Sequence, residues 1–114
     1  MKIDINLTKI RNKIEEAEKQ FGRRNNSVCL IAVTKTREIN EITDAINENQ
    51  RHFGENYCQE AVEKIKAINH SDLIWHFIGP IQSNKTNQIA RYFSWVHTLD
   101  RLKIARRLNE MRPD

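Results

Sequence analysis

Apolar positions in this chain follow two patterns that alternate from one end to the other. The first has steps of three and four residues, the spacing of an amphipathic helix. It begins near the amino end, where a stripe of this kind predicts a helix that Gly22 can terminate. The same spacing predicts four more helices. The apolar positions of the five helices are Ile3, Leu7, Ile10, Ile14, Ala17 and Phe21; Ile39, Ile42, Ala45 and Ile46; Cys58, Ala61, Val62, Ile65 and Ile68; Ile89 and Ala90; and Leu102, Ala105, Leu108 and Met111.

The second pattern consists of short apolar runs between these helices. Such runs, bounded by turn residues, are typical of strands. They predict four strands, at residues 28–34, 51–54, 73–78 and 95–99. The first run is continuously apolar and β-branched, which predicts a strand buried on both faces. Ser83 and Asp100 are predicted to cap the two helices that follow the third and fourth strands.

The order of elements predicts the fold class. An opening helix followed by four strand–helix units, joined by short connections, predicts an α/β fold with a parallel sheet covered by helices. The chain has no linker and no low-complexity segment, so residues 1–114 are predicted to form one domain. The pattern alone fits a half-barrel and a small open sheet equally well.

Polar residues follow the ends of the predicted strands. In barrels and open sheets alike, chemistry gathers at the carboxyl ends of parallel strands. That rule brings together Lys35 after the first strand and Glu55 and Asn56 after the second. It adds His76 and Gly79 from the third strand, and Thr98 and Asp100 from the fourth.

Lys35 carries the clearest chemical signal. Lysine is strongly hydrated and rarely buried, so one that ends a core strand suggests an amine whose pKa is lowered by desolvation. A neutral amine on a rigid support is what Schiff-base chemistry with a carbonyl compound requires. The alternative is that Lys35 lays its stem along the apolar wall and keeps its charge in water.

Four segments resemble one family in their order and spacing. They are the residues 32–36 around Lys35, then 53–57 (FGENY), 76–85 (HFIGPIQSNK) and 97–102 (HTLDRL). Together they resemble the pyridoxal phosphate homeostasis proteins, whose barrel binds pyridoxal 5'-phosphate (PLP) and is related to the N-terminal domain of alanine racemase. The resemblance spans nearly all of the chain. It implies that the fold is the first half of an eight-stranded (β/α)8 TIM-type barrel and that Lys35 is the Schiff-base lysine.

The resemblance also implies a function and exposes one departure. Members of the family are regarded as PLP carriers or regulators of vitamin B6 and amino-acid pools, with no established catalytic turnover. They are about twice as long as this chain, and their later segments, which bind the cofactor phosphate, have no counterpart here. We therefore expect a truncated form, an incomplete PLP-binding barrel in which cofactor binding is weakened. A relic without cofactor affinity is the alternative.

Other candidate site residues have simpler readings beside the functional one. Asn56 offers a donor and an acceptor suited to the phenolic oxygen or imine of PLP, and it is also an ordinary turn residue. His76 alternates with Trp75 and Phe77, so it could face the barrel interior and pack on a cofactor ring; a satisfied core histidine is the alternative. Ser83, Asn84 and Lys85 open a helix and could bind an anion, although capping explains them too.

The remaining candidates predict neither a metal site nor a second chemistry. Glu55 is most simply a loop carboxylate paired with a nearby base. His52, His70 and His97 have no ligand spacing, so no metal is assigned. Catalytic residues are not assigned either.

Composition narrows the class of protein. With 39% hydrophobic and 30% charged residues, the chain has no disorder signature and no apolar run of membrane-spanning length. The amino end lacks the apolar core of a secretory signal, which predicts a cytoplasmic protein. Cys29 and Cys58 are isolated and are predicted to be reduced packing residues.

The net charge of +4 arises entirely in the last third of the chain. Residues 83–114 hold seven Lys or Arg and three Asp or Glu, whereas the preceding residues are balanced. An interaction module that binds an acidic partner or nucleic acid through the basic last helix is thus the second functional class, and a solvated helix face is the simpler reading.

A sheet of four strands also leaves two open edges, which predicts a homodimer, with a monomer or aggregation as alternatives.

Overall fold

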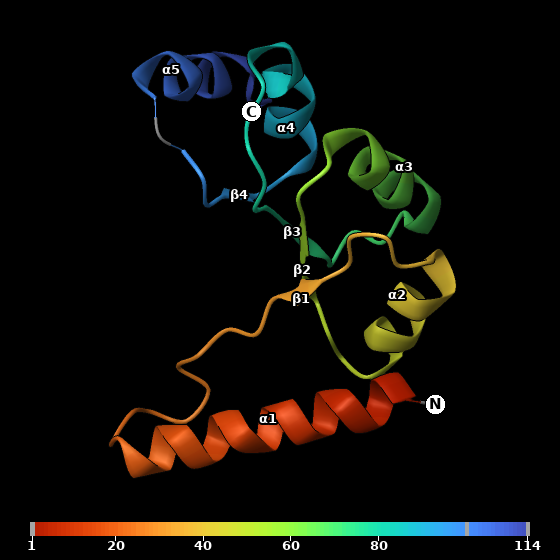
Figure 1. Cartoon of the computed structure of the whole chain (residues 1–114), viewed down its shortest axis with the longest axis vertical. Coiled ribbons are helices and arrows are strands. Elements are labelled where there is room, and N and C mark those ends of the chain that lie inside the picture. Colours follow the sequence, from red (N-terminus) through yellow and green to blue (C-terminus); the bar gives the residue numbers. More distant parts are fainter. Residues whose placement is uncertain (1, 100, 114) are drawn as a thin grey trace.

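A four-stranded parallel sheet forms the centre of the computed structural model, which describes residues 2–99 and 101–113 (Figure 1). The strands are β1 (Ala32–Val33), β2 (His52–Glu55), β3 (Ile74–Phe77) and β4 (Trp95–Val96). They lie in the order β1-β2-β3-β4, so each strand pairs with the next one in sequence. Ala32 pairs with Phe53, Phe53 with Trp75, and Phe77 with Val96. The predicted parallel α/β class is confirmed.

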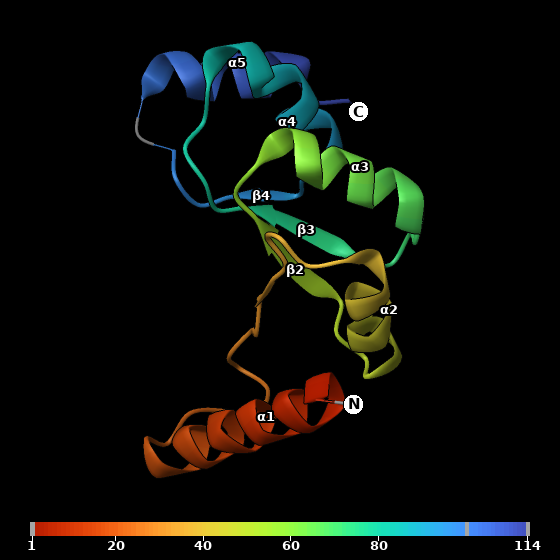
Figure 2. The same cartoon turned by 45° about the vertical axis from the view of Figure 1, so that its right-hand side comes forward.

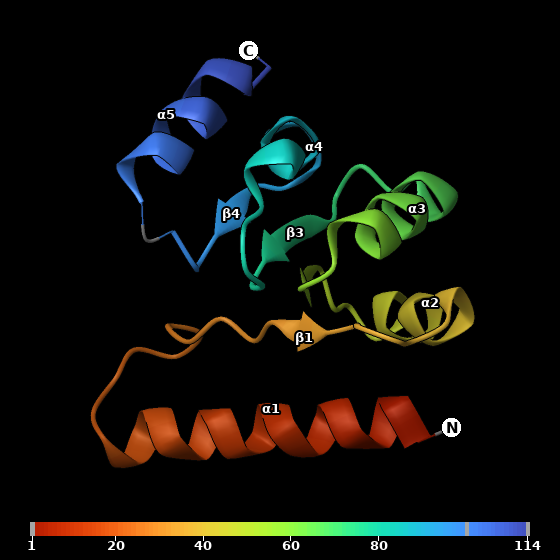
Figure 3. The same cartoon turned by 45° about the horizontal axis from the view of Figure 1, so that its top comes forward.

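In the part of the chain that the structure describes, five α-helices accompany the sheet, at the positions that the apolar spacing predicts. They are α1 (Lys2–Gln20), α2 (Ile39–Asn47), α3 (Cys58–Ile68), α4 (Thr86–Tyr92) and α5 (Leu102–Met111), and a single 3-10 turn, η1 (Ser83–Lys85), precedes α4. Helices α2, α3 and α4 lie on one side of the sheet (Figures 1 and 2). Helix α1 lies at the β1 edge, and α5 lies beside α4 at the other end (Figure 3). Within the described ranges, none of the helices has both the length and the apolar character that a bilayer crossing requires.

The hydrophobic core lies between the sheet and these helices. Alternate residues of the central strands point into it: Phe53 is 0% exposed, Trp75 5% and Phe77 2%. They meet the apolar faces of the helices, where Ile42, Ala61 and Ile89 are each at most 1% exposed. Burying a large apolar side chain contributes about 1.5 to 3 kcal/mol, so this layer is the main source of stability.

The first strand differs from its prediction. It comprises only Ala32 and Val33, and the chain before it is irregular, with Val28 40% and Val33 48% exposed. The expectation of a strand buried on both faces is therefore wrong. The physical reason is position: β1 is an edge strand, paired only with β2, and helices cover one side of the sheet.

Two predicted helix faces are also partly wrong. On α1 Leu7 is buried, but Phe21, just beyond the helix, is 73% exposed. On α5 the buried residue is Ile104, whereas Leu102 is 67% and Met111 39% exposed, because the packing of α5 on α4 selects a different face from the one expected.

The predicted cap at Ser83 is wrong. The Ser83 side chain does not cap α4; the Ser83 carbonyl accepts a hydrogen bond from the Thr86 hydroxyl at 2.9 Å instead, within the 3-10 turn. Asp100 lies outside the described residues. Arg101 occupies the N-cap position of α5, without a side-chain capping bond.

Candidate functional site

The carboxyl ends of three strands meet as the fold rule predicts. A Cβ atom on Gly79 would lie 2.3 Å from the Asn56 carbonyl oxygen, so only glycine fits between the ends of β2 and β3. The Thr98 hydroxyl donates a hydrogen bond to the Gly79 carbonyl, which joins the end of β4 to the same cluster. Asn56, Gly79 and Thr98 therefore form one continuous edge.

Lys35 lies two residues beyond the end of β1, in a tight turn. The turn is closed by a hydrogen bond of 3.0 Å from the Arg37 amide to the Thr34 carbonyl, with Lys35 and Thr36 as its central residues. The Lys35 side chain is exposed. The expected burial of this lysine is thus wrong for this structure, because the strand ends at Val33 and the chain leaves the sheet there.

Asn56 has hydrogen-bonding capacity that the described residues leave unused. Its side-chain oxygen is buried, and no hydrogen-bond partner for it is found among the described residues. Since buried polar atoms are nearly always paired, such an atom at the carboxyl ends of the strands marks a place where a ligand group could complete the bonding. The residues present fit a polar aromatic cofactor in this respect.

His76 is the centre of a row of three histidines on one face of the sheet. Its Nε2 lies 2.9 Å from His52 Nδ1, and its Nδ1 lies 2.9 Å from His97 Nε2. The Trp95 ring stacks on it, with centroids 6.1 Å apart and an interplanar angle of 8°. Trp75 and Phe77 lie in the hydrophobic core, as the predicted alternation of faces requires. Both ring nitrogens of His76 thus have partners, as in the predicted alternative of a satisfied histidine.

The environment of His76 favours a neutral ring. Burial, together with the neighbouring His52 and His97, lowers its pKa from 6.5 to about 4. Each nitrogen-to-nitrogen contact needs one N–H and one lone pair, so three neutral imidazoles can satisfy the row. The ring nitrogens at the two contacts of the row bond to one another. Among the described histidines, cysteines and carboxylates, no cluster of three or more could hold a metal ion.

A buried ionic network contacts Thr34, the residue before Lys35, and sequence reasoning missed it. Lys64 Nζ lies 3.3 Å from a Glu55 carboxylate oxygen and 2.6 Å from the Thr34 carbonyl, and the Thr34 hydroxyl bonds to the same carboxylate. Glu55 is 0% exposed, so it is not the loop carboxylate that was expected, although its pairing with a base is confirmed. Burial raises the pKa of Glu55, against the lowering effect of Thr34 and Lys64.

A signal for this network existed in the sequence. Lys64 lies three residues after Ala61 on the apolar face of α3, where a solvated lysine is out of place. It also lies four residues after Glu60, with which it forms an ion pair of 2.8 Å. The histidine row was harder to find, because it crosses the sheet diagonally: His76 is aligned with Gly54 and Trp95, two residues away from His52 and His97.

The anion site at residues 83–85 stays a prediction, and these residues form the 3-10 turn η1. Lys85 lines a pocket with Asn56, Cys58 and Gln82, whereas the Ser83 carbonyl accepts hydrogen bonds from Thr86 and from Arg107.

Both cysteines are free. Cys58 is buried, which raises the pKa of its thiol, but Cys29 is exposed, so its predicted packing role is wrong.

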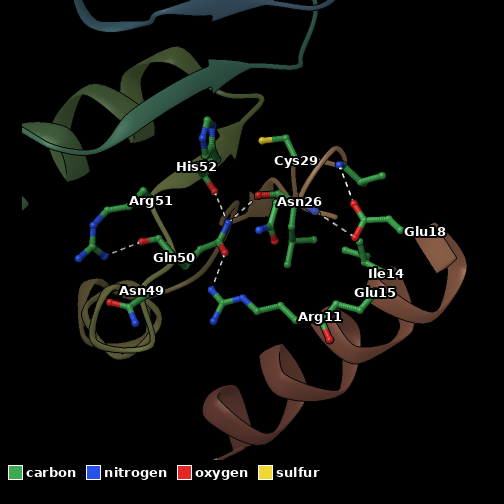
Figure 4. A pocket seen from close by; sticks show the side chains of 12 residues that line it. Arg11, Ile14, Glu15, Glu18, Asn26, Cys29, Asn49, Gln50, Arg51 and His52 are labelled. Atoms are coloured by element: carbon green, nitrogen blue, oxygen red, sulfur yellow. Dashed lines mark hydrogen bonds between the residues drawn. The ribbon is translucent and has the colours of Figure 1, made fainter. Parts of the chain in front are cut away.

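A second pocket lies at the opposite, amino ends of the strands (Figure 4). Its polar residues bond mainly to one another: Arg11 reaches Gln50 at 2.9 Å, and Gln50 donates to the Leu30 carbonyl at 2.7 Å. Glu18 accepts hydrogen bonds from the turn that follows α1. Burial works to raise the pKa of Glu18, but hydrogen bonds from Val28, Asn26 and Ser27 outweigh it and lower the pKa. This network ties α1 to the sheet.

Comparison with known proteins gives consistent relatives. No family model matches the chain. A pyridoxal phosphate homeostasis protein of Haemophilus influenzae is 53% identical over 115 residues, which covers 99% of this chain and 48% of the relative. One of Vibrio cholerae is 51% identical and covers 97% of this chain and 49% of the relative. The chain spans about half the length of the curated relatives it matches.

Solved structures resemble the fold over the same extent. PipY of Synechococcus elongatus, determined with PLP bound, is 35% identical with a TM-score of 0.79, covering 96% of this chain and 47% of PipY. An unknown protein from Bifidobacterium adolescentis is 30% identical with a TM-score of 0.82, covering 95% of this chain and 48% of that protein.

A parallel sheet with helices on one side, and with its polar cluster at the strand carboxyl ends, defines an α/β protein of the barrel-forming (β/α) type. Within that class, the chain is a homologue of the pyridoxal phosphate homeostasis protein family over nearly its whole length and corresponds to about half of such a protein. The resemblance seen in the sequence is confirmed.

Proposed function

We propose that this chain binds PLP in vitamin B6 homeostasis and holds the cofactor as a Schiff base on Lys35. The observation that carries the proposal is the place of Lys35: an exposed amine in a tight turn at the carboxyl end of β1, in a chain 35% identical to a protein solved with PLP. When bound, PLP would supply an aldehyde that condenses with an unprotonated primary amine and releases the carbonyl oxygen as water. The protein contributes the amine and the rigid support beneath it.

Two more residues belong to the proposed cofactor site. Asn56 would use its unpartnered side-chain oxygen, or its amide N–H, on a polar group of the cofactor. His76 would form part of the wall beside the ring, with the Trp95 ring stacked on it. Of the two, Asn56 has the stronger support, because His76 already has partners on both ring nitrogens. We take residues 1–114 as one domain for this purpose.

The proposal predicts selective labelling of Lys35. Purified protein is incubated with PLP and reduced with borohydride, and its peptides are mapped by mass spectrometry. We expect the pyridoxyl group predominantly on Lys35, with an absorbance band of the bound cofactor that is absent in Lys35→Ala. Lys66→Ala, which removes an exposed lysine of α3, is the matched control and should keep the label on Lys35. Labelling spread over surface lysines, unchanged in Lys35→Ala, would refute the assignment.

We propose further that this protein is a carrier or regulator rather than an enzyme. PLP enzymes tune the cofactor through a partner at the pyridine nitrogen, and they place a substrate group against the cofactor. Among the residues that the structure describes, we assign none to the pyridine nitrogen and none to a substrate. The PLP-loaded protein should therefore leave racemase, transaminase and decarboxylase substrates unchanged. Sustained turnover of an amino acid that disappears in Lys35→Ala would contradict this.

The alternative of a nucleic-acid or acidic-partner module has less support from the geometry. Arg107 and Arg112 of the basic end donate to carbonyls of neighbouring segments, to Ser83 at 3.4 Å and to Ala90 at 2.9 Å. Arg101 donates to the Ile81 carbonyl at 3.3 Å. These side chains help to hold α5 against the fold. A cytoplasmic location stays a prediction from the sequence.

We propose that a second copy of this chain covers the helix-free side of the sheet. Val33 is 48% and Trp95 57% exposed there, and β1 and β4 each have one strand neighbour, so two copies could complete an eight-stranded arrangement. We expect light scattering to give a dimer. We also expect PLP to be lost on dialysis, because it is held mainly by the imine. A monodisperse monomer that keeps stoichiometric PLP would contradict both expectations.

A further inference from the structure

The turn that carries Lys35 contains an unfavourable backbone conformation. Thr36 has a φ of 61°, in the left-handed region, which is uncommon for any residue except glycine and is an outlier for a β-branched one. A residue held in this region costs about 1 to 3 kcal/mol and persists only where its surroundings enforce it. The structure therefore supplies interactions that hold Thr36, and with it Lys35, in place.

Those interactions come from one turn of helix α3. Glu60 accepts a hydrogen bond of 2.8 Å from the Thr36 amide, on one side of Lys35. Lys64 donates a bond of 2.6 Å to the Thr34 carbonyl, on the other side. Glu60 and Lys64 form an ion pair of 2.8 Å, so a single ion pair bonds to the backbone on both sides of Lys35. We call this pair the Glu60–Lys64 clamp.

The buried Glu55 carboxylate holds the Lys64 end of the clamp in place. The Lys64 side chain is 8% exposed and lies 3.3 Å from the buried Glu55 carboxylate, which also accepts a hydrogen bond from the Thr34 hydroxyl. The hydrogen bond from Lys64 lowers the pKa of Glu60, so the Glu60 carboxylate is ionised in the neutral range. Strand β2, helix α3 and the turn are thereby joined into one unit.

We propose that Glu60 and Lys64 are positioning residues, which fix the turn so that the Lys35 amine is presented in one orientation to an aldehyde. This inference rests on the proposed function of Lys35. Orienting a nucleophile reduces the entropy lost on the way to the transition state, so release of the turn should slow Schiff-base formation. A purely stabilising ion pair would change the unfolding temperature and leave that rate unchanged in folded protein.

The test compares Glu60→Ala with the matched control Glu63→Ala. Glu63 lies on the same helix, is exposed, and contacts Gln59 rather than the turn. With PLP as the probe, and at a temperature where every variant is folded by circular dichroism, we expect Glu60→Ala to form the Lys35 imine about tenfold more slowly than wild type. Glu63→Ala should match wild type.

A rescue variant separates positioning from stability. Glycine adopts a positive φ without strain, so Thr36→Gly in the Glu60→Ala background should keep the turn without the clamp and recover most of the rate. Equal rates for Glu60→Ala and wild type, or the same slowing in Glu63→Ala, would overturn the positioning role while leaving Lys35 assigned. A wild-type protein that takes no label on Lys35 would overturn the proposed function itself, and the clamp with it.

Discussion

Replacement of Lys64 by methionine is expected to lower the free energy of unfolding by about 3 to 5 kcal/mol at pH 8. The methionine fills a similar volume but leaves the Glu55 carboxylate, 0% exposed, without the cation 3.3 Å away. A buried charge that loses its partner is far more costly than the pair was favourable. Denaturant unfolding followed by circular dichroism measures the loss.

The loss should depend on pH in a defined direction. Burial already raises the pKa of Glu55, and removal of Lys64 removes a lowering influence. When the pKa of a carboxyl group is higher in the folded than in the unfolded chain, the fold loses stability as pH rises above the pKa of the unfolded chain. The variant should therefore be least stable at pH 8 and regain stability toward pH 5.

A double variant keeps this prediction testable if Lys64→Met does not fold. In Lys64→Met/Glu55→Gln the buried charge is gone, and we expect a folded protein with much of the lost stability restored. Lys66→Met, on the exposed side of α3, is the control for the loss of a lysine. A single variant as stable as wild type at pH 8, or a double variant no better than the single one, would show that the pair is not a unit.

Acidification is expected to destabilise the protein through His76. Burial, with added contributions from His52 and His97, lowers the pKa of this histidine from 6.5 to about 4, so the unfolded chain takes up a proton that the folded ring resists. Stability from the neutral ring is complete above pH 6.5 and is lost as pH falls toward 4. At about 1.4 kcal/mol per pKa unit, the loss attributable to His76 is about 3 kcal/mol. Unfolding curves measured from pH 8 to pH 4 show it.

The histidine responsible can be isolated with a matched pair of variants. His76→Gln keeps a polar side chain within reach of His52 and His97 but cannot titrate, so it should flatten the fall in stability between pH 6.5 and 4. His70→Gln removes an exposed histidine and should leave the pH profile of wild type unchanged. The same slope in His76→Gln and wild type would mean that the ring is not held neutral by burial.

Most of the architecture could be predicted from the spacing of apolar residues. Central elements such as β3 and α3 were placed well because both depend on continuous or periodic burial that the sequence records directly. The edge elements were not. Val28 belongs to an apolar run yet is 40% exposed, since burial at an edge depends on what packs against it rather than on the run itself.

The candidate site was predicted in outline and missed in its support. Strand-end reasoning brought together Asn56, Gly79 and Thr98, because the topology of a parallel sheet dictates that meeting. The partnership of Lys64 with Glu55 joins a helix to a strand end, and no local pattern specifies such a pair. The strained φ of Thr36 is likewise invisible in a sequence, because threonine ordinarily signals extended backbone.

The spatial order of the strands has a consequence for how the chain folds. Because β1, β2, β3 and β4 lie side by side in sequence order, each strand after β1 pairs with the strand that precedes it in the chain. Ala32 pairs with Phe53, and Phe53 pairs with Trp75, so the segments of chain between these paired residues are short. The entropy lost on closing them is correspondingly small. Folds built from contacts between segments that are near in sequence form faster than folds that must pair distant segments, so among parallel sheets this one is of the kind that folds quickly.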